Sequence, residues 1–158
     1  MESFATNAMP PAMTNRPAVI VCERKGVWAA AVRRHLPPAV RLCETRSLAD
    51  CRRELAAAPS CLVAVEVNPA NLLAALELFA EMGRRYPLAR AVAIAQRGGA
   101  PFEAALREAG AIYFTTSPRE ADVLARLAVR HAARIPLART TFAAQIWDSL
   151  PWPEMAAS

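Results

Sequence analysis

The stretch EAGAIYFTTSPREADVLARLAVRH, residues 108–131, contains a helix end, a strand and a new helix in direct succession. Gly110 closes the first helix, because glycine readily adopts the left-handed conformation found just beyond helix C-termini. Residues 112–115 are β-branched or aromatic and predict a short strand. The sequence SPRE at 117–120 has the pattern of a capping box with proline at the first helical position, and predicts a helix to about Arg134. This succession is typical of one unit of a parallel α/β sheet.

The same alternation of strand and helix extends through the chain before this stretch. Four apolar or β-branched runs predict strands, which cover residues 18–22, 40–44, 61–65 and 91–95. Helical periodicity between them predicts helices, which cover residues 27–36, 47 to the break at Pro59, 68–86 and 101–109. The spacing places Gly83 on the buried face of the third helix and Ala105 on that of the fourth.

Five strands in alternation with five helices predict an α/β fold of the flavodoxin-like (βα)5 type, a three-layer sandwich around a parallel sheet. The expected strand order is 2-1-3-4-5, because the first, third and fourth strands are the most apolar and belong inside the sheet. A ligand or catalytic site in such a sheet lies at the carboxyl ends of the first and third strands.

The length of 158 residues predicts one domain, at residues 17–135, between a flexible tail at 1–16 and a C-terminal tail at 136–158. Hydrophobic residues make up 54% of the chain, which favours a packed core over disorder. No apolar run has the length of a membrane span, and the N-terminus lacks the pattern of a secretory signal. We therefore expect a cytoplasmic protein with no membrane contact.

The net charge of +5 comes almost wholly from arginine, since Lys25 is the single lysine. The arginines are spread over several helices without interleaved aromatics, which disfavours nucleic acid as a partner. The spacing of the cysteines matches no metal motif, and there is no nucleotide-binding loop, so neither a metal nor a cofactor is predicted. Free buried thiols are the expected state of Cys22, Cys43, Cys51 and Cys61.

Residues 109–118, AGAIYFTTSP, resemble a segment of the receiver domains of two-component response regulators. In that family, Ala-Gly-Ala leads into the fifth strand, which ends in Lys-Pro. The resemblance covers about residues 17–135, and Pro69 falls on the proline that follows the phosphorylated loop. It implies a CheY-like fold. It also implies a pocket in which an aspartate takes a phosphoryl group beside Mg²⁺, an acidic pair, a hydroxyl and a lysine.

The residues at those pocket positions depart from the receiver pattern. The acidic pair reads Cys22-Glu23, and the acceptor position reads Val65 with Glu66 next to it. The hydroxyl and lysine positions read Ala95 and Ser117. Valine cannot accept a phosphoryl group, so we expect a degenerate pseudo-receiver that lacks the phosphorylation site and is not an enzyme.

Two of these positions allow more than one interpretation. Glu66 points away from Val65 on a regular strand, so Glu23 and Glu66 are expected at the solvent-facing rim, although a twisted strand end would let them bind a divalent ion weakly. Ser117 is expected to cap the following helix, and the alternative is a catalytic role. Phe114 lies where receivers carry an aromatic switch residue, but core packing is the main expectation.

The last predicted helix carries an arginine stripe, and Arg107 and Phe114 extend the surface around it. We predict that this surface is the contact for a protein partner or for a second copy in a homodimer, and the alternative is a solvated helix face. The stripe consists of Arg119, Arg126, Arg130 and Arg134.

The C-terminal tail contains a short amphipathic segment with large apolar side chains. It is expected to pack on its own domain as a helix, to bind another protein, or to be disordered. The anchor residues are Phe142, Ile146, Trp147 and Trp152.

Three functions follow from these observations. The first is a protein-interaction module in signal transduction that does not depend on phosphorylation. The second is a small-molecule- or metal-binding domain that uses the rim near Glu23, Glu66 and Gln96. The third is weak binding of nucleic acid, which the absence of a following helix-turn-helix pattern disfavours.

Overall fold

The structure is a computed structural model that describes residues 18–96 and 98–135. Its five strands lie parallel in the order β2-β1-β3-β4-β5, which confirms the predicted topology. The adjacent pairing of β1 and β3 places the carboxyl ends of these two strands side by side. The strands are β1 (Ala18–Cys22), β2 (Arg41–Thr45), β3 (Leu62–Val67), β4 (Arg90–Ala95) and β5 (Ala111–Thr115).

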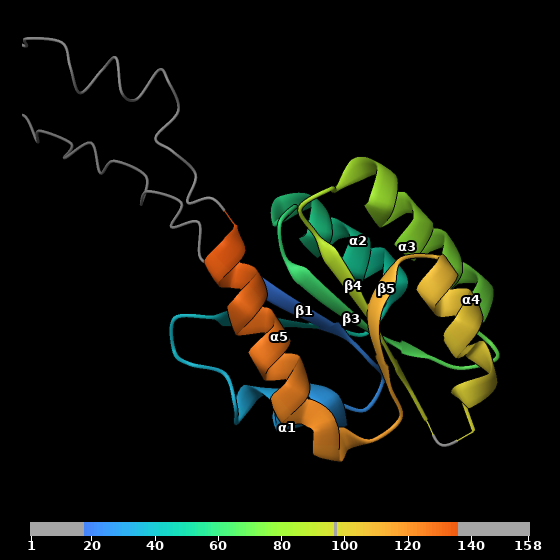
Figure 1. The fold of residues 1–158 in the computed structure, drawn as a ribbon, viewed down its shortest axis with the longest axis horizontal. Coiled ribbons are helices and arrows are strands. Elements are labelled where there is room, and N and C mark those ends of the chain that lie inside the picture. The colour runs from blue at the N-terminus through green and yellow to red at the C-terminus, as the bar shows by residue number, and fades with distance from the viewer. Residues whose placement is uncertain (1–17, 97, 136–158) are drawn as a thin grey trace, which may run out of the picture. The chain divides into compact units, whose positions relative to one another are not determined.

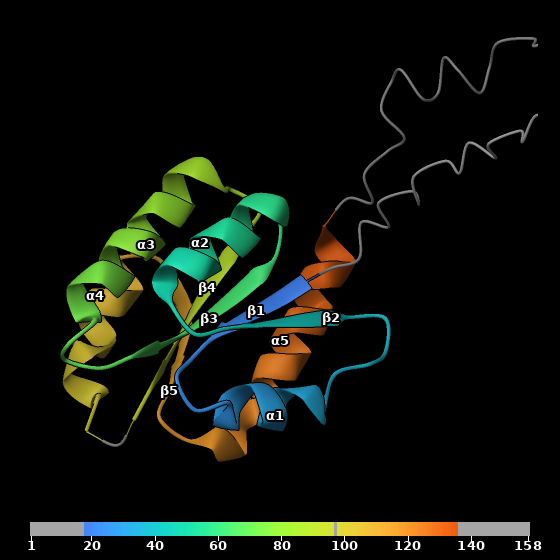
Figure 2. The same cartoon turned by 180° about the vertical axis from the view of Figure 1, so that it is seen from behind.

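Five α-helices cover the two faces of this sheet, as Figures 1 and 2 show from opposite sides. Helices α1 and α5 lie on one face, and α2, α3 and α4 lie on the other. Short 3-10 turns at Ala100–Phe102 and Pro118–Glu120 precede α4 and α5. The helices are α1 (Val27–Arg33), α2 (Leu48–Ala57), α3 (Leu72–Arg85), α4 (Glu103–Glu108) and α5 (Ala121–Arg134).

Alternation along the strands divides the core into two apolar clusters. In β3, Val63 and Val65 face the cluster under α2, α3 and α4, whereas Leu62 and Ala64 face the cluster under α1 and α5. Both clusters are closed to water because successive strand residues point to opposite sides, and each side is covered by helices. The continuous apolar runs in the sequence follow from this double burial.

Several predicted boundaries were wrong for local reasons. Helix α1 ends at Arg33 instead of residue 36, because the residue before Pro37 avoids helical geometry. Strand β3 continues to Val67, two residues beyond the predicted end, which places Glu66 inside the strand. Helix α3 begins late, because the Asn68 side chain accepts the Ala70 and Asn71 N–H groups in a turn.

The predicted burial of two small residues was also wrong. Gly83 is exposed, with open space around it, and Ala105 is exposed on α4. Larger neighbours on the same helices, Met82 and Leu106, point into the core in their place. None of the helices described combines the length and the apolarity that a membrane crossing requires.

The pairing of β4 with β5 contains one irregularity. Ala91 pairs with Ala111, and the next pair joins Val92 to Tyr113, so Ile112 has no partner on β4. Such a bulge bends the strand and changes the direction of a side chain. Ile112 is accordingly 44% exposed, although it lies in the middle of an apolar segment.

Candidate functional site

The carboxyl ends of the strands form a rim around a cavity of about 220 Å³. Glu23 follows β1, Glu66 lies near the end of β3, and Gln96 follows β4. The loop after β5 contributes Thr116 and Pro118. The predicted position of a site beside the first and third strands therefore agrees with the cavity that the fold forms there.

Glu23 is a buried cap of helix α1. Its side chain is 3% exposed, and its carboxylate accepts the Trp28 N–H at 3.0 Å and the Ala29 N–H at 2.5 Å. These N–H groups lie in the first turn of α1, where no residue of the helix itself can accept them. The N-cap position holds Gly26, which has no side chain to offer. The negative charge is also favourable beside the positive end of the helix dipole.

Glu66 connects three segments of the rim. One carboxylate oxygen accepts the Arg24 N–H at 3.0 Å, and the other accepts the Gln96 side-chain amide at 3.2 Å. Its backbone carbonyl accepts the Asn71 side-chain amide at 2.8 Å. Glu66 is 8% exposed, so the expectation that both rim carboxylates face solvent was wrong. Glu66 is buried because it lies inside the longer strand β3, and Glu23 is buried because it caps helix α1.

The two carboxylates line the same cavity, but each is engaged by its own N–H donors. Within residues 18–96 and 98–135, no group of three or more His, Cys, Asp or Glu side chains is placed to hold a metal ion. Lys25 also lines the cavity. Lys25 was not among the predicted site residues, because a lysine was expected only at the end of the fifth strand.

The remaining pocket positions separate in space. Ala95 lines the rim cavity, whereas Val65 is fully buried in the cluster under α2, α3 and α4, to which Cys22 also belongs. Thr116 lines the cavity, and Ser117, the residue at the lysine position, does not. Thr116 was not among the predicted site residues, and its one signal in the sequence was its place next to Ser117.

Ser117 caps the turn that precedes α5, but not through a capping box. Its hydroxyl oxygen accepts the Arg119 N–H at 3.3 Å, and its own N–H is bound by the Thr115 hydroxyl at 3.1 Å. Glu120 was predicted to reach back to that N–H and instead accepts the Tyr113 hydroxyl at 2.8 Å. The 3-10 turn moves Glu120 out of capping-box geometry. The Ser117 N–H, which Glu120 would accept in a capping box, donates to the Thr115 hydroxyl instead.

The four cysteines are free thiols, as expected, although Cys43 is only partly buried. Cys22 and Cys51 interact between the end of β1 and helix α2. A hydrogen bond from Cys51 lowers the pKa of Cys22 to about 7, whereas the same bond and burial raise the pKa of Cys51. Burial raises the pKa of Cys61 to about 12.

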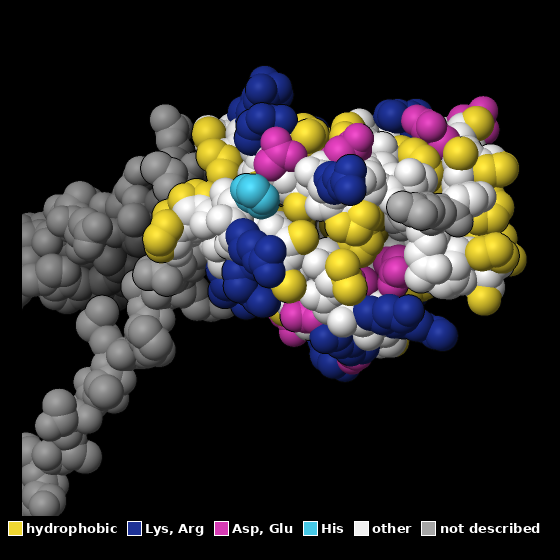
Figure 3. Space-filling view, turned by 90° about the horizontal axis from the view of Figure 1, so that it is seen from below, with side chains coloured by type: hydrophobic (Ala, Val, Ile, Leu, Met, Phe, Trp, Pro, Cys, Tyr) yellow, Lys and Arg dark blue, Asp and Glu magenta, His cyan; other side chains and the backbone are white. Residues whose placement is uncertain are grey.

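The five arginines of the predicted surface are exposed. Arg107 pairs with Glu103 at 2.8 Å, and Arg126 pairs with Asp122 at 3.2 Å. The other stripe residues, Arg119, Arg130 and Arg134, form no ion pair with any residue that the structure describes. Figure 3 shows basic and apolar side chains interspersed on one face of the molecule.

Phe114 is partly buried against the cluster under α2, α3 and α4, which agrees with a packing role. The predicted tail anchors, Phe142, Ile146, Trp147 and Trp152, lie outside the described residues.

Solved structures share this architecture. A CheY-like protein from Pseudomonas aeruginosa is 20% identical, with a TM-score of 0.60 over 76% of this chain and 96% of that chain. A response regulator from Thermotoga maritima is 17% identical, with a TM-score of 0.63 over 74% and 98%. An atypical orphan response regulator, described as having a phosphorylation-independent regulatory mechanism, is 16% identical, with a TM-score of 0.59 over 74% and 96%.

No family model matches the sequence, and no curated protein matches it. The structural matches confirm the predicted CheY-like receiver fold of residues 18–135.

Proposed function

We propose that the chain is a degenerate receiver that serves in signalling as a protein-interaction module, works without phosphorylation and catalyses no reaction. The observation that carries this proposal is that the rim offers no free carboxylate at the position of a phosphoryl acceptor. Val65 stands at the position of the phosphoryl acceptor, and the carboxylates of Glu23 and Glu66 are occupied by internal hydrogen bonds. The similarity to an orphan regulator described as phosphorylation-independent supports the same function.

Phosphoryl transfer to a carboxylate needs a free nucleophile and a metal ion to offset the developing charge. Glu66 could attack only after it released Arg24 and Gln96, and Glu23 could bind a metal ion only at the expense of its bonds to helix α1. Release of Glu23 leaves two buried N–H donors unpaired, at a cost of about 1–3 kcal/mol per group, and release of Glu66 breaks two partly buried hydrogen bonds. The two carboxylates of the rim therefore fit a structural role better than phosphoryl transfer.

Incubation with acetyl phosphate and Mg²⁺ tests the proposal, because Lys25 still brings one cation to the cavity. The intact mass of the full chain should stay unchanged, while a phosphorylatable receiver treated in parallel should gain one phosphoryl group. Glu66→Gln is the matched variant. A phosphoryl adduct on the wild-type chain that disappears in Glu66→Gln would overturn the proposal.

The contact surface that we propose is the exposed face formed by α4, β5 and α5. It carries the arginines at positions 107, 119, 126, 130 and 134, and it fits a protein partner of opposite charge or a second copy of the chain. Residues 17–135 form the module in this proposal. The tail at 136–158 supplies a second contact through its aromatic and aliphatic anchors.

The alternative function is a small-molecule site in the rim cavity, for which the cavity itself is the supporting observation. Its volume of about 220 Å³ is below the roughly 300 Å³ at which ligand pockets usually begin. A thermal-shift screen of metals and nucleotides separates the two functions, because a bound ligand raises the unfolding midpoint.

A further inference from the structure

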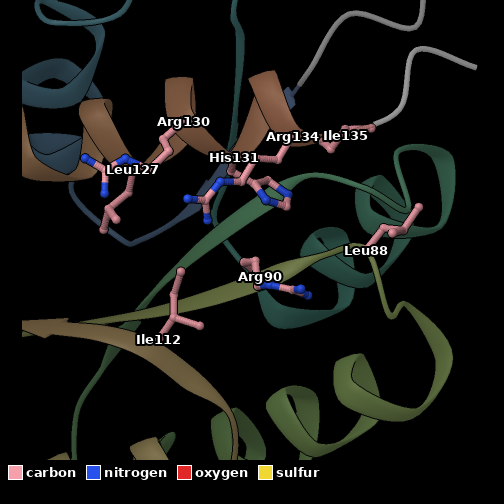
Figure 4. Close-up of a pocket in the computed structure, with 8 residues that line it drawn as sticks. All are labelled: Leu88, Arg90, Ile112, Leu127, Arg130, His131, Arg134 and Ile135. Atoms are coloured by element: carbon pink, nitrogen blue, oxygen red, sulfur yellow. The ribbon is translucent and has the colours of Figure 1, made fainter.

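A second cavity, of about 180 Å³, lies between helix α5 and the first residues of β4 and β5. Figure 4 shows its two sides: Leu127, Arg130 and His131 on α5 lie across from Arg90 on β4 and Ile112 on β5. Arg90 is the first residue of β4, so this cavity lies toward the amino ends of the strands. The rim cavity lies at their carboxyl ends.

The cavity has an apolar lining that water reaches. Leu88 is 51% exposed and Ile112 is 44% exposed, and both are among the large hydrophobic side chains that the fold leaves most open. The bulge between β4 and β5 is what turns Ile112 outward, since the residue has no partner on β4. Leu127 and Ile135 complete this lining from the helix side. An apolar side chain that enters the cavity would remove all four from water.

The same cavity is strongly cationic. Arg90, Arg130 and Arg134 line it, and none of the three forms an ion pair with a carboxylate of residues 18–96 or 98–135. Arg90 donates to the backbone carbonyls of Pro87 and Ala89, both at 2.8 Å, which fixes its direction but leaves its charge uncompensated.

His131 adds no further charge at neutral pH. Burial lowers the pKa of this side chain, and its Nε2 atom lies 3.0 Å from the Ser60 carbonyl oxygen. The positive charge of the cavity therefore comes from its three arginines.

We propose that this cavity binds an acidic peptide segment of a partner protein, with one apolar side chain inserted and its flanking carboxylates bound by the arginines. Guanidinium groups bind carboxylates through paired hydrogen bonds, and apolar anchors beside arginines are typical of the energetic centres of protein interfaces. The proposal rests on the proposed interaction function and names the part of the surface, and the partner chemistry, that it uses.

Nucleic acid fits this cavity less well. Among the described residues that line it there is no Phe, Tyr or Trp to stack on a base, the ring of His131 is held against the Ser60 carbonyl, and half of the lining is aliphatic. The three arginines surround one small hollow, whereas a phosphate backbone is bound by charges spread along a groove. Charge and apolar area in the same small hollow match an amphipathic acidic peptide.

Selection of phage-displayed random peptides on the full chain tests the proposal. The enriched peptides should carry Asp or Glu next to an aliphatic or aromatic residue. A synthetic copy of the most enriched peptide, labelled with fluorescein, is then titrated with the chain and followed by anisotropy. Arg130→Glu should weaken its binding about tenfold or more, since charged hydrogen bonds are lost and repulsion is gained. Ile112→Ser should weaken it several-fold.

Arg84→Glu is the matched control, because Arg84 is an exposed arginine in the last turn of α3, outside the cavity. It should leave the affinity within about twofold. No enrichment, enrichment of peptides without acidic residues, or an equal loss in Arg84→Glu would overturn the proposal. Binding of a DNA duplex that is lost in Arg130→Glu would also overturn the proposal. The same holds for self-association of the chain, measured by sedimentation, that is lost in Arg130→Glu. The acetyl phosphate result is independent of all these outcomes, so the two proposals fail separately.

Discussion

Glu23 and Glu66 are buried carboxylates at the carboxyl ends of the strands, and each serves the structure through its hydrogen bonds. Glu23 compensates for Gly26 at the start of α1, because it binds the Trp28 and Ala29 N–H groups from a position before the helix. Glu66 joins the loop after β1 to the loop after β4. Both carboxylates thus stabilise the rim at the carboxyl ends of the strands.

At this scale we predict that Glu23→Ala lowers the free energy of unfolding by about 2 kcal/mol, because two buried N–H groups lose their acceptor. Glu23→Gln should cost about half as much, since one acceptor oxygen remains. Urea denaturation followed by circular dichroism measures both. Glu77→Ala, which removes an exposed carboxylate from α3, is the control and should change stability by less than about 0.5 kcal/mol. An equal effect of Glu23→Ala and Glu77→Ala would show that the cap contributes nothing.

The elements that differ from the sequence expectation do so at their ends. Strand β3 is longer than predicted, α1 is shorter, and α5 begins after a 3-10 turn. The extension of β3 places Glu66 inside the strand, and the bulge in β5 exposes Ile112 beside α5. Gly110 and Gly83 have different roles at the junction of α4 with β5 and inside α3, and substituting each by alanine tests this difference.

Gly110 joins α4 to β5 with a φ of 114°, whereas Gly83 lies inside α3 with open space around it. Gly110→Ala should lower the free energy of unfolding by about 1–2 kcal/mol, because a side chain is strained in the left-handed region. Gly83→Ala should raise it by about 0.5–1 kcal/mol, because alanine favours the helix. Thermal and urea unfolding of both variants check the opposite signs. Two changes of the same sign would contradict this assignment.

At the scale of the whole molecule, one sheet separates two apolar clusters that have no side chains in common. Leu55, on α2, belongs to the cluster under α2, α3 and α4, and Ile94, on β4, belongs to the cluster under α1 and α5. The clusters are joined through the hydrogen-bonded strands between them, so we expect the domain to unfold as one cooperative unit.

Leu55→Ala should cost about 3 kcal/mol and Ile94→Val about 1 kcal/mol, each through the cavity that it leaves. The double variant should lose about the sum, because the two sites lie on opposite faces of the sheet. Circular dichroism and tryptophan fluorescence should report one coincident urea transition for all three variants. Two separate transitions would show that the faces unfold independently. A sum that fails by more than about 1 kcal/mol would show that the two sites are coupled across the sheet.

The sequence by itself determined the order of the elements and the topology of the sheet. Continuous apolar strands, amphipathic helices and the segment at residues 108–131 suffice for this, because local periodicity directly reflects which faces are buried. That Val65 carries no carboxylate and Ser117 no amine was also evident from the sequence, because the chemical identity of a side chain does not depend on the fold.

The tertiary structure alone decided which contacts the side chains of the rim and of α5 make. No pattern in the sequence shows that Glu23 caps a helix across a glycine, that Lys25 lines the rim cavity, or that Glu66 meets Gln96. The cavity beside α5 likewise joins Arg90, Ile112 and Arg130, which are distant in the chain. These contacts depend on strand register and on a one-residue bulge, and such long-range pairings are set only when the sheet assembles.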